Sequence, residues 1–288
     1  MKPVSFEYFA PTSVADAVSL LQEHGPEAKL LAGGQSLVPL LNMRLARPTA
    51  VIDVNRVEGL DYVREDGDAL AIGAMTHQRT VERSELVQRV NPLLHAATRL
   101  IGHPQIRNRG TVGGSIAHAD PAAEYPAVAL ALDAEMRIVG PNAERLVPAA
   151  DFFVTYLTTA LEPTEMLTEV RVPALPQGTG WSIQEMTRRH GDFALAGAAV
   201  TLTMDGGACS DARIVLFGVG ATPLRVQQAE ERLVGERVDA TLMSEVGREI
   251  KTSIDEPLAD IHATSEYRRN LAGVLTERAL VEALERAA

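Results

Sequence analysis

Two short segments of the chain carry paired glycines beside polar side chains. They are Ala32–Ser36 (AGGQS) and Thr111–Ser115 (TVGGS). Glycine lets the backbone approach a ligand closely and adopt positive φ, and successive N–H groups in such a turn form a concavity that binds anions. Two such segments that converge would clasp a diphosphate from both sides. Each one taken singly is more typical of an ordinary Gly-Gly turn.

Neither segment matches the commoner nucleotide-binding motifs. The chain contains no G-x-x-x-x-G-K-[ST] and no G-x-G-x-x-G, the patterns that bind phosphates in P-loop and Rossmann proteins. Gly218–Gly220 (GVG) continues as Ala-Thr-Pro and is interpreted as a strand end. Arg107 and Arg109, just before the second segment, could supply positive charge to a diphosphate or lie solvated on a surface loop.

Sequence patterns of hydrolases and metalloenzymes are absent. Gly34–Val38 (GQSLV) matches only part of the G-x-S-x-G nucleophile elbow, because the second glycine is missing. No H-E-x-x-H occurs, and His103, His118 and His190 lack cysteine or carboxylate partners at ligand spacing. We therefore predict no catalytic acid, base or nucleophile and no metal ligand in this chain.

Composition restricts the partners and the compartment. The 288 residues carry a formal net charge of −11, which argues against nucleic acid and against an anionic membrane surface. No run approaches the roughly 18 apolar residues of a transmembrane helix, so we expect no stable membrane insertion. The single cysteine, Cys209, can form neither an internal disulfide nor an iron–sulfur site of about four thiolates. No secretory signal is visible, and we expect a cytoplasmic protein.

Helical and strand patterns alternate in the first part of the chain, which favours an α/β arrangement. Strands are predicted at 29–32, 50–54, 69–74, 135–139 and 166–172. Helices are predicted from Val14 to the glycine-proline stop at Gly25, at 84–101 with a bend at Pro92, and at 122–132. Residues 102–120 form a polar stretch that is rich in glycine.

The character of the sequence changes after Pro173–Gly180 (PALPQGTG), the best linker candidate. Strands are predicted at 181–187, 194–204 and 212–219, with a hairpin turn at Asp205–Gly207. The remainder is expected to be helical, with one buried face that contains Tyr267, Leu271, Leu275 and Leu284. We therefore predict one domain at 1–175, with subdomains at about 1–55 and 56–175, and a second domain at 177–288.

Around the two glycine segments the chain resembles the FAD-binding medium subunits of carbon monoxide dehydrogenase, xanthine dehydrogenase and related molybdenum hydroxylases. The resemblance rests on LLAGGQSLVPLLNMRLARPTAVIDV, IGHPQIRNRGTVGGSIAHADPAAEYPA and RRHGDFALAGAAV. It implies an α+β fold. A vanillyl-alcohol-oxidase-like (PCMH-type) FAD-binding domain of two α/β subdomains would precede an α+β C-terminal domain with a small antiparallel sheet and helices.

The resemblance also implies which residues contact FAD. The family's two diphosphate loops, with the leucines that adjoin the first, match Leu30, Leu31, Ala32, Gly33, Gly34, Gln35, Ser36, Leu37, Thr111, Val112, Gly113, Gly114 and Ser115. A flavin-packing position falls on Ile101 and another apolar position near the flavin on Leu167, although both would be ordinary core residues in any fold. The carboxylate that contacts the adenosine part falls on Glu124. An aromatic residue close to the isoalloxazine falls on Phe193.

Three of these positions depart from the family's usual residue. Ser115 stands where asparagine is frequent, so the donor has a shorter reach. Glu124 replaces a frequent aspartate and is one methylene longer. Phe193 replaces a frequent tyrosine, so stacking is retained and the phenol hydrogen bond is lost.

By resemblance the chain is an electron-transfer subunit that binds FAD. A small subunit would carry [2Fe–2S] clusters and a large subunit the molybdopterin cofactor, with the complex a dimer of heterotrimers (a heterohexamer). Electrons would pass from the clusters through FAD to an external acceptor, since this chain lacks cluster-ligating cysteines. The alternatives are a self-contained FAD-dependent oxidase of the same fold and a flavin-free scaffold subunit. The small C-terminal domain argues against the first and the intact glycine segments against the second.

Overall fold

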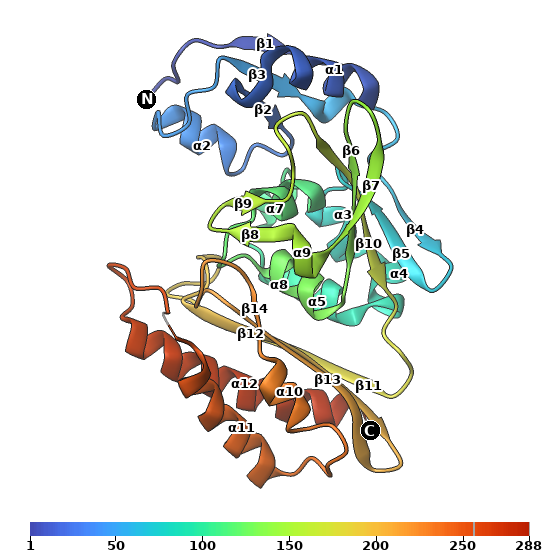
Figure 1. The fold of residues 1–288 in the computed structure, drawn as a ribbon, viewed down its shortest axis with the longest axis vertical. Coiled ribbons are helices and arrows are strands. Elements are labelled where there is room, and N and C mark those ends of the chain that lie inside the picture. The colour runs from blue at the N-terminus through green and yellow to red at the C-terminus, as the bar shows by residue number, and fades with distance from the viewer. Residues whose placement is uncertain (256, 288) are drawn as a thin grey trace.

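Three sheets follow one another along the longest axis of the molecule (Figure 1). The structure, a computed structural model, describes residues 1–255 and 257–287. A three-stranded sheet lies at one end, a five-stranded sheet in the middle and a four-stranded sheet at the other end. No helix in the described residues is both long and apolar enough to cross a membrane.

The N-terminal sheet is parallel, with the order β1-β3-β2. Its strands are β1 (Glu7–Phe9), β2 (Ala28–Leu31) and β3 (Ala50–Asp53). Its helices are α1 (Val14–His24), η1 (Gly25–Glu27), α2 (Leu37–Asn42) and η2 (Val54–Arg56). The Ser13 side chain accepts a hydrogen bond from the Asp16 N–H and starts α1. This helix buries Ala17, Val18 and Leu21, which confirms the apolar face predicted for it.

The central sheet is antiparallel, with β10 in the middle of the order β4-β5-β10-β6-β7. Its strands are β4 (Val63–Asp66), β5 (Ala69–Gly73), β6 (Glu135–Val139), β7 (Glu144–Pro148) and β10 (Met166–Pro173). The helices of this region are α3 (Gln78–Arg83), α4 (Glu85–Val90), α5 (Pro92–Leu100), α6 (Pro104–Arg107), α7 (Val112–His118), α8 (Glu124–Ala131) and α9 (Ala149–Phe152). A small hairpin joins β8 (Phe153–Thr155) to β9 (Thr158–Thr159).

Two helical stretches of this region differ from the sequence patterns. The helix predicted at 84–101 is two helices, because the Asn91 side chain accepts from the Leu94 N–H and starts α5 anew with Pro92 in its first turn. The polar, glycine-rich stretch 102–120 contains α6 and α7, which the sequence pattern did not predict. Local capping and packing outweigh the poor helix propensity of glycine in this stretch.

The C-terminal sheet has the antiparallel order β11-β12-β13-β14. Its elements are β11 (Thr179–Met186), β12 (Ala196–Asp205), β13 (Ala208–Phe217), β14 (Leu224–Arg225), α10 (Gln227–Glu231), α11 (Ala240–Ser253) and α12 (Ser265–Ala287). The hairpin predicted at Asp205–Gly207 is confirmed, with φ of 58° at Gly206 and 88° at Gly207. On α12, Leu271 and Leu275 are buried as predicted, whereas Tyr267 is exposed.

The C-terminal sheet lies between two layers of helices (Figure 1). One face packs on α12 and α10, with α11 packed against α12, and the other face packs on α5 and α8 of the preceding region. Phe217 of β13 belongs to the same buried cluster as Tyr125 of α8. The domain boundary near residue 176 stays a prediction, and it falls in the segment between β10 and β11.

Arg268 of α12 ties the start of β12 to the end of β13. Its side chain is 4% exposed, and it donates to the carbonyls of Leu195 and Gly218 and to the Asp260 carboxylate. The Gly218 N–H donates in turn to the Pro121 carbonyl at 2.7 Å, just before α8. One buried guanidinium therefore fixes the strand ends that meet the preceding region.

We expect Arg268→Ala to lower the free energy of unfolding by about 3 kcal/mol, because two buried carbonyls lose their donor. Arg278→Ala is the matched control, since Arg278 lies exposed on the same helix. Urea unfolding followed by far-UV circular dichroism measures both variants. Equal stability of the two would contradict the role given to Arg268.

Candidate cofactor site

The first glycine segment connects β2 to α2 and offers unpaired donors. Gly34 has a φ of 74°, a conformation that L side chains rarely adopt. Within the described residues, the N–H groups of Gly33, Gly34, Gln35 and Ser36 donate to no protein atom. Two carbonyls of this segment accept hydrogen bonds from side chains. The amide of Asn55 donates to the Ala32 carbonyl at 2.9 Å, and the amide of Gln35 donates to the Gly33 carbonyl at 3.2 Å. Four successive N–H groups are thus available to an anion.

The second glycine segment is built differently, because it forms the start of α7. Thr111 is the N-cap residue, and its hydroxyl accepts from the Gly114 N–H at 3.0 Å. The N–H groups of Val112, Gly113 and Ser115 donate to the carbonyls of Thr76, Ala74 and Thr111, at 2.9, 2.9 and 3.1 Å. The hypothesis that both glycine pairs present free N–H groups is therefore wrong for this segment.

The two segments lie in contact although 80 residues separate their glycine pairs (113 − 33). A β-carbon placed on Gly33 would lie 2.2 Å from the carbonyl oxygen of Arg109, so no side chain fits there. A β-carbon on Gly114 would lie 3.6 Å from that of Ala32. The residues predicted to clasp a diphosphate are thus brought together at the junction of the first two sheets.

Arg107 is neither a cation available to a diphosphate nor a solvated surface residue, the two possibilities that the sequence offered for the arginine pair. Its side chain is 5% exposed and donates to the Glu82 carboxylate at 3.0 and 3.1 Å. It also donates to the carbonyl of Ile101 at 2.8 Å. Arg107 therefore fixes the turn after α5 and is neither a free cation nor a solvated one.

Arg109 is exposed and lies beside the first segment. Its charge acts on Asp53 at the end of β3. Burial raises the pKa of that carboxyl, but hydrogen bonds from Tyr8 and Asn55, together with the Arg109 charge, hold it below its usual value. Arg109 is therefore the cation of the pair that remains available to a phosphate.

The remaining predicted contacts differ in exposure. Ile101 and Leu167 are 9% and 5% exposed and belong to the central core. Leu30 and Leu31 of β2 and Leu37 at the start of α2 are half-buried. Phe193, between β11 and β12, is 60% exposed. Phenylalanine rings are normally buried, so the exposed ring of Phe193 is free to pack against a ligand.

The loop that carries Phe193 rests on the turn after Ile101. The imidazole rings of His103 and His190 stack with centroids 5.8 Å apart and an interplanar angle of 11°. A β-carbon on Gly191 would lie 2.5 Å from the His103 ring. Sequence reasoning missed this contact, because no local pattern links two histidines 87 residues apart (190 − 103).

Two carboxyl groups with raised pKa values lie on α8 and β11. Glu124, the first residue of α8, is 6% exposed. Burial, reinforced by the charges of Glu185 and Asp120, raises its pKa to about 8. Burial raises the pKa of Glu185 on β11 to about 7. Glu185 was missed, although the alternation of the predicted strand places it on the same face as Trp181 and Ile183.

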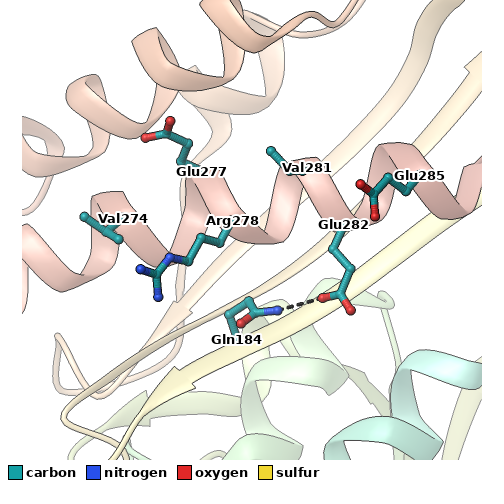
Figure 2. A pocket seen from close by; sticks show the side chains of 7 residues that line it. All are labelled: Gln184, Val274, Glu277, Arg278, Val281, Glu282 and Glu285. Atoms are coloured by element: carbon teal, nitrogen blue, oxygen red, sulfur yellow. Dashed lines mark hydrogen bonds between the residues drawn. The ribbon is translucent and has the colours of Figure 1, made fainter.

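An open groove on the C-terminal domain lies apart from these residues (Figure 2). It is lined by Gln184, Val274, Glu277, Arg278, Val281, Glu282 and Glu285. Gln184 donates to Glu282 within it at 2.6 Å. It contains none of the predicted contacts. No group of histidine, cysteine and carboxylate side chains in the described residues could hold a metal ion.

Comparisons with known proteins agree on one family. Residues 4–175 match the "FAD binding domain in molybdopterin dehydrogenase" and residues 181–283 the "CO dehydrogenase flavoprotein C-terminal domain". The chain is 43% identical over 288 residues to the 6-hydroxypseudooxynicotine dehydrogenase complex subunit alpha of Paenarthrobacter nicotinovorans, covering 100% of this chain and 97% of that protein. It is 42% identical to the carbon monoxide dehydrogenase medium chain of Hydrogenophaga pseudoflava, with 100% of each chain covered.

Solved structures agree with the sequence comparisons. Carbon monoxide dehydrogenase from Hydrogenophaga pseudoflava superimposes with a TM-score of 0.97 at 42% identity, covering 100% of both chains. Quinoline 2-oxidoreductase from Pseudomonas putida 86 gives 0.95 at 35% identity, covering 100% of this chain and 99% of that one. The predicted fold class is thereby confirmed. The chain belongs to the family of FAD-binding medium subunits of molybdenum hydroxylases.

Proposed function

We propose that the chain relays electrons from [2Fe–2S] clusters of a partner subunit, through FAD held at the two glycine segments, to an external acceptor. The observation that carries the proposal is the run of four unpaired N–H groups from Gly33 to Ser36. Such a run suits a diphosphate in a protein whose net charge of −11 would otherwise repel it. Arg109 adds a local cation at the same place.

The residues around the segments fit the other parts of FAD. The second segment offers hydroxyls, since Thr111 accepts from Gly114 and keeps its own O–H free to donate. Ser115 is half-buried beside it. Ile101 and Leu167 provide apolar surface, and the exposed ring of Phe193 can cover a flat ring system. The Glu124 carboxyl can accept hydrogen bonds from the adenosine part.

The chain's own residues bind and orient the cofactor. FAD, when bound, supplies the redox chemistry that lets electrons arriving one at a time leave as a pair. The protein contributes N–H donors, a cation and apolar walls, and these fix the position of the ring and tune its potential. No acid or base of this chain is required in the relay.

Partner subunits must supply the other electron carriers. As the medium chain of a carbon monoxide dehydrogenase-type complex, this chain implies a small and a large subunit. We assign [2Fe–2S] clusters to the small subunit and molybdopterin to the large one, in a dimer of heterotrimers in the cytoplasm. The only cysteine, Cys209, is free, and burial raises its pKa to about 11. It is therefore suited to neither cluster ligation nor redox exchange.

The first test concerns the glycine at positive φ in the first segment. We expect the wild-type chain to bind about one FAD non-covalently, and Gly34→Ala to weaken binding about tenfold or more. A β-carbon there costs about 1–2 kcal/mol at this φ and shifts the N–H groups out of convergence. Flavin fluorescence titration measures the affinity, and urea unfolding measures the stability.

Gly207→Ala is the matched control for that variant. Gly207 also has a positive φ, and nothing lies within 4 Å of its added β-carbon. The control should lose similar stability and keep the wild-type FAD affinity. If the two variants retained flavin equally, the first segment would not be the diphosphate site. A wild-type chain that takes up no FAD would favour the scaffold alternative.

The second test concerns assembly. We expect the endogenous complex to contain this chain with a [2Fe–2S] subunit and a molybdenum subunit, each in two copies. Native mass spectrometry with metal analysis of the purified complex gives both compositions. A mass that corresponds to this chain alone, with turnover of an organic substrate, would instead support a self-contained oxidase.

A further inference from the structure

The direction of a free N–H group in the first glycine segment depends on the carbonyl of the same peptide. A peptide is planar and trans, so its C=O and N–H point in opposite directions, and the described residues contain no cis peptide. The Ala32 carbonyl shares a peptide with the Gly33 N–H, and it accepts from the Asn55 side chain at 2.9 Å. The first of the four free donors is therefore directed by Asn55.

The other bonded carbonyls of the segment accept from within the segment or from α2. The Gly33 carbonyl accepts from the Gln35 amide at 3.2 Å, and the Gly34 carbonyl accepts from the Val38 N–H at 3.1 Å. Within the part of the chain that the structure describes, the Asn55 bond is thus the one hydrogen bond that ties a carbonyl of this segment to another element.

Asn55 is itself held by a carboxylate. The Oδ1 atom of Asp53 accepts from the Asn55 N–H at 2.9 Å and from the Asn55 Nδ2 atom at 2.6 Å. Only the NH2 end of the amide can donate to Asp53 and to the Ala32 carbonyl at once, so the two acceptors fix which way the amide faces. The Oδ2 atom of Asp53 accepts from the Tyr8 hydroxyl at 2.6 Å. Both carboxylate oxygens are therefore engaged.

These groups come together at one edge of the N-terminal sheet. Its strands are parallel; Tyr8 lies on β1, Asp53 ends β3 and Ala32 follows β2. Asn55 lies in η2, directly after β3. Open sheets of parallel strands bind their ligands at the carboxyl ends of the strands. The bonded set is therefore built at the edge that also presents the free donors.

We propose that Asn55 is a positioning residue for FAD: through the Ala32 carbonyl it directs the Gly33 N–H at the diphosphate, and Asp53 orients it for that task. This inference rests on the proposed function, which places the diphosphate at the first glycine segment. It goes beyond that function by assigning roles to two residues that act through the segment.

Folding alone gives little reason for this arrangement. Asn55 is exposed, so water could replace its bond to the Ala32 carbonyl with little loss of stability. A free carboxylate beside a diphosphate would weaken binding by repulsion. The Asp53 oxygens instead accept hydrogen bonds from Tyr8 and Asn55, and the Arg109 charge acts on the same carboxyl. Asp53 can thus orient Asn55 while its charge is offset.

The test compares FAD binding by the wild-type chain, Asn55→Ala and Asn55→Asp. Flavin fluorescence titration gives the dissociation constants, urea unfolding gives the stabilities, and phosphorus NMR reports on the diphosphate of bound FAD. We expect Asn55→Ala to bind FAD about tenfold more weakly, with little change in stability because the side chain is exposed. Asn55→Asp keeps the size and replaces the donor with oxygen, so it should bind at least as weakly. In both variants the phosphorus resonances should move toward those of free FAD.

Asn270→Ala is the matched control, since Asn270 is an exposed asparagine on α12 of the other domain. It should bind FAD like the wild type. Wild-type affinity in Asn55→Ala would overturn the inference while FAD binding itself stood. Weaker binding with unchanged phosphorus resonances, or only in proportion to a loss of stability, would overturn it as well. A wild-type chain that binds no FAD would overturn the proposed function with it.

Discussion

The contact of Gly33 with the backbone at Arg109 is the constraint on which the rest of the site depends. A β-carbon at this position would lie 2.2 Å from a carbonyl oxygen, a distance that only movement of one backbone could relieve. At this point the segment after β2 meets the segment before α7 through backbone alone, whereas elsewhere Met75 and Met166 of the central region share a buried cluster with the N-terminal sheet. This close approach sets the first segment beside α7. Without it, the donors of Gly33–Ser36 and the hydroxyls of Thr111 and Ser115 could not serve one ligand.

The two glycine pairs are similar in sequence but have different structural roles. In the first, glycine leaves N–H groups unpaired and turns the chain at positive φ. In the second, Gly113 and Gly114 are small so that α7 can pack: a β-carbon on Gly113 would lie 2.5 Å from that of Ala74. The proposed anion site is consequently asymmetric, with backbone donors on one side and side-chain hydroxyls on the other. Because Thr111 already accepts from the first turn of α7, the main attraction for a diphosphate would come from the first segment and Arg109.

Local patterns predicted the elements that depend on local information. The strand at 135–139 has the predicted bounds, and the hairpin predicted at Asp205–Gly207 is present with its turn at Gly206–Gly207, since side-chain alternation and turn glycines can be recognised in a short window. The helices inside 102–120 were missed because they depend on packing, α6 against α3 and α7 against β5 and β10. The burial of Glu185 and the stacking of His103 on His190 could not be predicted from the local sequence. Both arise only because the C-terminal sheet packs on α5 and α8. The predicted contacts themselves came from resemblance, and periodicity alone would have assigned Ile101 and Leu167 to the core.

The interface between the domains carries features that a packed interface would not otherwise keep. It contains an exposed phenylalanine, a buried Glu185 Oε2 atom without a hydrogen-bond partner and a glycine packed against a histidine ring. Each is unfavourable or neutral for folding, while the buried Arg268 and the apolar cluster around Phe217 hold the same interface together. The apolar contacts lie between α8 and the sheet, whereas the unpaired Glu185 oxygen and the exposed Phe193 lie at and after the end of β11. That separation is what a ligand site between domains requires, because rigid packing must position the groups that only the ligand can satisfy.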